Sequence, residues 1–147
     1  MNRITNLFKE KKNNILSIYF TAGFPSLNDT IEILKTLDET NVDLIEIGMP
    51  FSDPIADGPI IQNSSNVAIN NGMNLNVLFD QLSDIRNITD IPIVLMGYIN
   101  PVYQFGYKKF IQKLVKCDID GVILPDLPLE DYRTEFQSSF NKYNLSF

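Results

Sequence analysis

Two acidic residues in the middle of the sequence have settings that favour acid–base chemistry. Glu46 lies in the apolar stretch 43–48, which is typical of a buried strand, and Asp57 lies in the proline-rich loop that follows. Burial penalises the charged form of a carboxyl group, so we expect Glu46 to act as a general acid near neutral pH. A structural ion pair is the alternative, but no Lys or Arg lies near Glu46 in the sequence.

The loop between the two acids is expected to hold a fixed shape. Pro50, Pro54 and Pro59 restrict the backbone angle φ, and Gly58 can adopt backbone angles that other residues avoid. Asp57 precedes Gly58 and Pro59, a pattern typical of a helix start, so capping and catalysis are both open for this residue. Asp53 before Pro54 is also suited to forming a turn.

The composition excludes several familiar kinds of chemistry. None of the 147 residues is histidine, which excludes imidazole catalysis and histidine-ligated metals. The single Cys117 can form neither an internal disulfide nor a cysteine cluster, and we expect it to be a small buried apolar side chain. We therefore expect no metal site.

The net charge and the hydropathy of the chain limit which partners it is expected to bind and where in the cell it is expected to lie. A net charge of -6 argues against nucleic acid and anionic membranes, which bind clustered Lys and Arg. No apolar run approaches the roughly 18 residues that a membrane span needs, and the basic N-terminal segment lacks the apolar stretch of a secretion signal. With 44% hydrophobic residues, the chain is predicted to form a single cytoplasmic domain over residues 1–147.

Apolar periodicity predicts alternating strands and helices. Strands are predicted at 15–20, 43–48, 92–96 and 121–124, with a fifth beginning at 145–147. Helices are predicted near 4–8, from 29 to about 41, through 75–85, and at 107–115 and 130–142. This alternation indicates an α/β fold with a parallel sheet. Periodicity leaves open whether the sheet is doubly wound or part of a barrel.

The length bears on the barrel alternative. A (βα)8 barrel needs roughly 250 residues, so four βα units and the start of a fifth strand amount to about half of one. A half barrel would leave strand edges and apolar surface uncovered. We therefore expect the chain to be the N-terminal portion of a barrel, truncated at its C-terminus.

Four segments of the sequence match one known family. The run Glu-Ile-Gly-Met-Pro-Phe-Ser-Asp-Pro-Ile-Ala-Asp-Gly at 46–58 resembles the signature of the tryptophan synthase alpha subunit. Supporting matches are Tyr-Phe-Thr-Ala-Gly at 19–23, Leu-Met-Gly-Tyr-Ile-Asn-Pro at 95–101 and Gly-Val-Ile-Leu-Pro-Asp-Leu-Pro at 121–128. The resemblance covers the whole chain and implies the TIM barrel rather than the open sheet.

The resemblance also implies an activity. The family is a lyase of tryptophan biosynthesis, which cleaves indole-3-glycerol phosphate by a retro-aldol reaction into indole and glyceraldehyde 3-phosphate, without a cofactor of its own. Glu46 would then protonate indole C3 and help remove the glycerol hydroxyl proton. Asp57 would accept a hydrogen bond from the indole N–H and stabilise the positive charge that develops on the ring.

Further residues acquire roles through the same resemblance. The expected substrate-binding residues are Tyr19, Thr21, Met96, Tyr98, Ile123 and Pro125, for which ordinary barrel packing is the alternative. The residues expected to face a partner are Asp53, Pro54, Asn100 and Pro101. That partner is the tryptophan synthase beta subunit, which carries pyridoxal phosphate, in an alpha2beta2 heterotetramer.

Two other functions stay open on the sequence. In barrels of this type the substrate phosphate binds near strands seven and eight, so the isolated 147-residue chain is expected to be inactive. The chain could then serve only as a binding or regulatory module for the beta subunit. A different barrel enzyme acting on a sugar phosphate is the third reading, which the 46–58 match disfavours.

Overall fold

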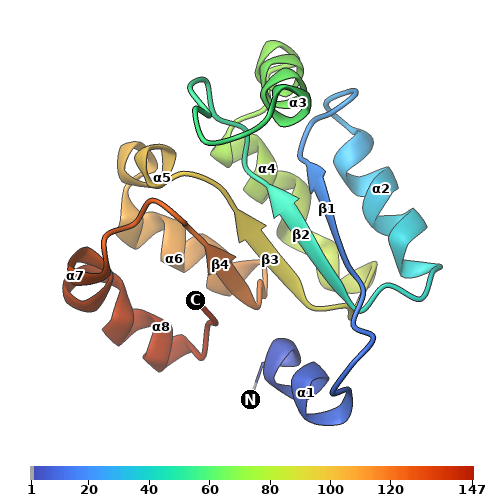
Figure 1. Ribbon diagram of the computed structural model, residues 1–147, viewed down its shortest axis with the longest axis vertical. Helices are drawn as coiled ribbons and strands as arrows, with labels where there is room; N and C mark the ends of the chain where they lie inside the picture. Colours follow the sequence, from blue (N-terminus) through green and yellow to red (C-terminus); the bar gives the residue numbers. More distant parts are fainter. Residues whose placement is uncertain (1) are drawn as a thin grey trace.

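The computed structural model describes residues 2–147 and contains a four-stranded parallel sheet (Figure 1). Its strands follow one another in chain order: β1 (Ser17–Thr21), β2 (Leu44–Gly48), β3 (Ile93–Met96) and β4 (Gly121–Ile123). Sequential order is the winding of a barrel, whereas a doubly wound sheet reverses direction at a switch point. The predicted α/β class is therefore confirmed, and the strand order supports the barrel.

Helices connect the strands. They are α1 (Arg3–Glu10), α2 (Asp29–Asp38), α3 (Pro59–Asn70), α4 (Leu75–Gln81), the 3₁₀ helix η1 (Leu82–Asn87), α5 (Ile99–Phe105), α6 (Tyr107–Lys116), α7 (Leu129–Asp131), the π-helix η2 (Tyr132–Phe136) and α8 (Gln137–Tyr143). Within the described part of the chain, none of them is long and apolar enough to cross a membrane.

Several helix predictions need correction. The predicted helix through 75–85 changes to 3₁₀ geometry at Leu82, and that at 130–142 contains a π-helical turn. Helix α5 was not predicted from the sequence. It has Pro101 in its first turn, where a missing N–H costs nothing, and its C-cap is Gly106 with φ 92°. Helix α2 ends at Asp38 rather than near residue 41.

The two faces of the sheet differ in their environment. Ile45, Ile47, Ile93 and Leu95 have no exposed surface, because they lie under α2, α4 and α6 on the far side of the sheet in Figure 1. The opposite face carries partly exposed side chains, among them Tyr19, Glu46, Met96 and Ile123. This division follows the two-residue alternation of a strand.

The last residues add the start of a fifth strand beside β4. Ser146 forms a parallel bridge with Gly121. Its carbonyl accepts from the Val122 N–H at 3.0 Å, and its N–H donates to the Asp120 carbonyl at 2.9 Å. The prediction for 145–147 is confirmed as a single bridge.

A buried ion-pair network fastens α1 and η1 to the amino ends of β3 and β4. Asp120, with 2% of its side chain exposed, lies between two guanidinium groups. Its Oδ2 is 2.6 Å from Arg86 Nη2, and its Oδ1 is 3.1 Å from Arg3 Nη1. The Ile93 N–H also donates to Oδ2 at 2.9 Å. One carboxylate thus joins an N-terminal helix, a 3₁₀ helix and two strands.

Replacing Asp120 is expected to destabilise the fold strongly. Asp120→Ala removes the buried anion between the two arginines, which then keep only the more exposed Asp118, and breaking a buried pair costs roughly 3 kcal/mol or more. The matched control is Asp80→Ala, which removes a surface pair with Lys113 at 3.3 Å and should cost below about 1 kcal/mol. Urea denaturation of the full-length protein measures the free energy of unfolding of both variants. Equal losses of stability would contradict the larger contribution expected from the Asp120 network.

Candidate functional site

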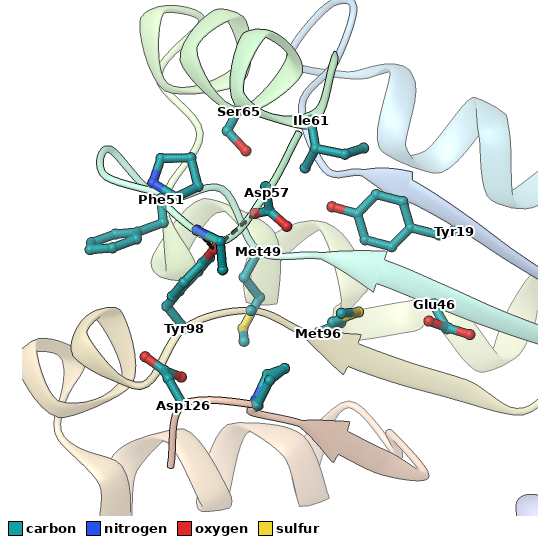
Figure 2. A pocket seen from close by; sticks show the side chains of 14 residues that line it. Tyr19, Glu46, Met49, Phe51, Asp57, Ile61, Ser65, Met96, Tyr98 and Asp126 are labelled. Carbon is teal, nitrogen blue, oxygen red and sulfur yellow. Dashed lines mark hydrogen bonds between the residues drawn. The ribbon is translucent and has the colours of Figure 1, made fainter. Parts of the chain in front are cut away.

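A cavity of about 470 Å³ lies at the carboxyl ends of the strands and contains both predicted acids (Figure 2). It is lined by Tyr19, Glu46, Met49, Phe51, Pro54, Ala56, Asp57, Ile61, Ser65, Met96, Gly97, Tyr98, Pro125 and Asp126. The β2–α3 loop and α3 form one side, and residues of β1 and β2, with residues at and after the ends of β3 and β4, form the rest. This is the end of a barrel at which active sites are built.

Glu46 is half-buried rather than buried as predicted, because the sheet face on which it lies is not covered by helices. Its Oε1 accepts a hydrogen bond from the Ser17 hydroxyl at 2.6 Å. Within residues 2–147 it forms no ion pair with a Lys or Arg. The side chain is therefore held by a neutral hydroxyl and borders the cavity.

Asp57 does not cap the following helix. Gly58 is the N-cap of α3 and no side chain caps that end, so the capping interpretation is wrong for Asp57. Its Oδ2 instead accepts from the Tyr98 hydroxyl at 3.2 Å. The same hydroxyl oxygen accepts from the Ala56 N–H at 3.2 Å. Tyr98 therefore fixes both the carboxylate and the backbone beside it.

Tyr98 is itself held in place from two sides. It lies directly before α5, at the N-cap position, and its ring lies 5.2 Å from that of Phe51. Burial raises the pKa of Tyr98, and the negative charge of Asp57 acts in the same direction. The hydroxyl therefore keeps its proton near neutral pH and remains a donor to the carboxylate.

Tyr19 lies across Gly48, one strand away. The parallel register pairs Tyr19 with Glu46, and a Cβ added to Gly48 would lie 2.1 Å from the Tyr19 hydroxyl oxygen. Only a glycine leaves room for this ring. Figure 2 shows the hydroxyl directed toward Asp57. Burial raises the pKa of Tyr19 as well.

The other predicted substrate residues fall into two groups. Met96 and Pro125 line the cavity, whereas Thr21 and Ile123 do not. Thr21 is buried, with its hydroxyl 2.7 Å from that of Ser64, and Ile123 lies partly exposed in β4. The alternation of side chains along a strand predicts which face of the sheet Thr21 and Ile123 take. It does not predict how far along each strand the cavity extends.

The residues predicted to face a partner differ in how exposed they are. Pro54 is buried and lines the cavity, while Asp53 beside it is exposed. In α5, Asn100 is exposed and Pro101 half-buried. Contact with a partner stays a prediction for all four.

Several residues of the cavity were not predicted from the sequence: Met49, Phe51, Ala56, Ile61, Ser65, Gly97 and Asp126. Asp126 accepts from the Ile99 N–H at 2.9 Å and so ties the loop after β4 to the start of α5. Five of them lie in the loops that follow strands, and Ile61 and Ser65 lie in α3. The rule that sites form at the carboxyl ends of strands was the signal that could have found them.

A sequentially wound parallel sheet, with helices on one face and a cavity lined by acidic side chains at the carboxyl ends of its strands, has the architecture of the TIM-barrel class. The family model described as "Tryptophan synthase alpha chain" matches residues 5–147. The chain belongs to the tryptophan synthase alpha chain family.

Individual relatives agree with this assignment. The tryptophan synthase alpha chain of Parabacteroides distasonis is 51% identical over 145 residues, which cover 99% of this chain and 56% of the relative. That of Flavobacterium johnsoniae is 54% identical, covering 99% and 57%. The chain therefore spans about half the length of these curated relatives.

Solved structures confirm the fold. The tryptophan synthase subunit alpha of Legionella pneumophila str. Paris aligns with a TM-score of 0.90 at 35% identity, covering 99% of this chain and 57% of that one. A chain of the tryptophan synthase complex of Pyrococcus furiosus aligns with a TM-score of 0.82 at 37% identity, covering 91% and 55%. The predicted TIM-barrel family, with four βα units and the start of a fifth strand, is thus confirmed.

Enlarging Gly48 is expected to displace Tyr19. Gly48→Ala introduces a methyl group where the ring lies, and such overpacking costs roughly 1 to 3 kcal/mol. Adding Tyr19→Ala should recover most of the loss, because the clash then disappears. The control is Gly58→Ala, whose new Cβ meets nothing within 4 Å. Urea denaturation compares the variants, and a Gly48→Ala protein as stable as the wild type would show that the ring lies elsewhere.

Proposed function

We propose that the cavity is the indole end of an active site that cleaves indole-3-glycerol phosphate into indole and glyceraldehyde 3-phosphate. One observation carries the proposal: Glu46 and Asp57 line the same cavity, with the apolar Met96 side chain on its floor. About 470 Å³ is within the range of small-molecule sites. A mostly apolar hollow lined by both Glu46 and Asp57 suits a flat heteroaromatic ring that must be protonated at carbon.

Glu46 is proposed as the acid and then the base. Its carboxyl group donates a proton to indole C3, which turns the ring into an iminium-like electron sink. The resulting carboxylate removes the proton of the hydroxyl group on the adjacent side-chain carbon. The oxygen's electrons form the aldehyde carbonyl as the bond from that carbon to C3 breaks, and the bonding pair restores the indole ring. The proton count is therefore balanced on one residue.

Asp57 is proposed to stabilise the charge that this sequence creates. Its carboxylate accepts from the indole N–H, and the attraction grows as C3 protonation makes the nitrogen positive. An interaction that is stronger in the transition state than in the ground state accelerates the step. The Tyr98 hydroxyl donates to Asp57 Oδ2 at 3.2 Å and so orients the carboxylate without neutralising its charge.

We further propose that the alpha chain works without a cofactor of its own and docks on a tryptophan synthase beta chain, which carries the pyridoxal phosphate. Asp53, Pro54, Asn100 and Pro101 remain the proposed contacts, and alpha2beta2 the proposed assembly. Ile55 supports an interface at this loop, since 89% of its surface is exposed beside Asp53.

The two competing functions receive less support. A pure binding module has no use for a carboxyl group in a strand or for a tyrosine that aims a second one. A sugar phosphate would not need an apolar floor such as Met96 provides. The retro-aldol lyase accounts for both acids and for the apolar lining.

Conservative replacement of the acids tests the proposal. In the full-length protein, Glu46→Gln should lower kcat for indole release by roughly 100-fold or more, because the amide cannot donate and recover the proton. Asp57→Asn should cost on the order of 100-fold, because the developing charge loses its counter-ion. Asp38→Asn, an exposed acid on α2, is the control. Near-normal kcat in Glu46→Gln would remove the proposed proton donor.

The 147 residues on their own are expected to turn over little substrate. They span about half the length of the relatives and, in barrels of this type, the phosphate is held near the seventh and eighth strands. Expression of these residues alone, followed by an indole-release assay, measures this directly. Turnover at the rate of a complete alpha chain would contradict the expectation.

A further inference from the structure

The Ser17 side chain faces Glu46 across the β1–β2 pair. In the parallel register, Tyr19 lies opposite Glu46 and Ser17 opposite Leu44. Because side chains alternate along a strand, Ser17 and Tyr19 share the face on which Glu46 lies. The Ser17 hydroxyl donates to Glu46 Oε1 at 2.6 Å, a short bond of the kind that carboxylates make.

No other group explains the orientation of Glu46. Within residues 2–147 its carboxylate has no ion pair, and its strand neighbours Ile45 and Ile47 point to the opposite face, under the helices. A glutamate on a partly exposed face has several rotatable bonds and would otherwise sample many positions. A hydroxyl on the adjacent strand removes that freedom, because both backbones are held by the same ladder.

The other hydroxyl groups of β1 have different surroundings. The Thr21 hydroxyl lies 2.7 Å from that of Ser64, and the Tyr19 hydroxyl is directed toward Asp57. Ser17 is exposed, and its hydroxyl donates to the Glu46 side chain. An apolar β-branched residue would suit this strand position better on propensity alone. The hydroxyl at residue 17 is therefore directed specifically at the acid.

We infer that Ser17 is a positioning residue for the reaction, which holds Glu46 Oε1 so that Oε2 carries the proton that is exchanged with the substrate. The inference rests on the proposed role of Glu46. Hydrogen bonding to one carboxyl oxygen leaves the other free, and it fixes the plane of the group relative to a ring bound above Met96. Ser17 acts through Glu46 and need not touch the substrate.

The test compares the steady-state kinetics of Ser17 variants in the full-length protein. Ser17→Ala should lower kcat by about tenfold, the usual worth of a hydrogen bond to a charged group, with KM changed by less than about twofold. Ser17→Thr keeps a hydroxyl and should retain most of the activity. Ser83→Ala removes a similar serine-to-carboxylate bond, to Asp84 at 3.1 Å on the surface, and should match the wild type.

A second pair of variants guards against a folding defect. Ser17→Val and Ser17→Thr have almost the same shape and differ by the hydroxyl, so their kcat ratio decides the matter even if the alanine variant is unstable. Thermal melts of all variants show that the comparison is made between folded proteins. Equal kcat in the Val and Thr variants would overturn the inference.

Glu46→Gln, measured in parallel, separates the inference from the proposed function. If that variant loses activity while Ser17→Val matches Ser17→Thr, Ser17 does not position the acid and the proposed function stands. If Glu46→Gln keeps near-normal kcat, the proposed proton donor is wrong, and the role of Ser17 is overturned with it. Loss in both, with rescue by Thr, supports the two together.

Discussion

Alternation of side chains along β2 is the constraint from which the arrangement of the site follows. Ile45 and Ile47 are packed without exposed surface under the helices, so Glu46 and Gly48 must face the other way. A one-residue slip of β2 would bury the carboxylate among aliphatic side chains and expose two isoleucines, which burial energies forbid. Gly48 also constrains the site, because the Tyr19 ring occupies the space that a Cβ on residue 48 would take.

The second acid is positioned by other means. Asp57 lies in a loop, where no sheet ladder fixes the backbone, and its orientation depends on the Tyr98 hydroxyl and on the prolines around it. Tyr98 is in turn held against Phe51 at 5.2 Å, so a loop residue and a residue after β3 stabilise one another. One carboxylate is thus held by a strand pair and the other by contact between loops.

The sequence predicted what depends on short-range pattern. Four strands lie within two residues of the predicted ranges, and the face of Glu46 follows from its apolar neighbours. The capping role of Asp57 was left open because its actual partner, Tyr98, is 41 residues away and no local pattern reports that contact. The same reason explains the missed Ser17–Glu46 bond, which joins two strands at a separation of 29 residues. Glu46 was predicted as buried because periodicity shows which face a residue takes, but not what covers that face.

Stability and chemistry occupy opposite ends of the sheet. At the amino ends of β3 and β4, the buried Asp120 pairs with the partly exposed Arg3 and Arg86, and none of the three lines the cavity of the proposed site. At the carboxyl ends, the acids are partly exposed and held by neutral hydroxyl groups. A cation beside Glu46 would have fixed it more firmly, but it would also have favoured the carboxylate so strongly that proton donation to carbon became difficult. A serine hydroxyl orients the carboxyl group without placing a second charge beside it, which suits the role proposed for Glu46 of giving up a proton and taking one back.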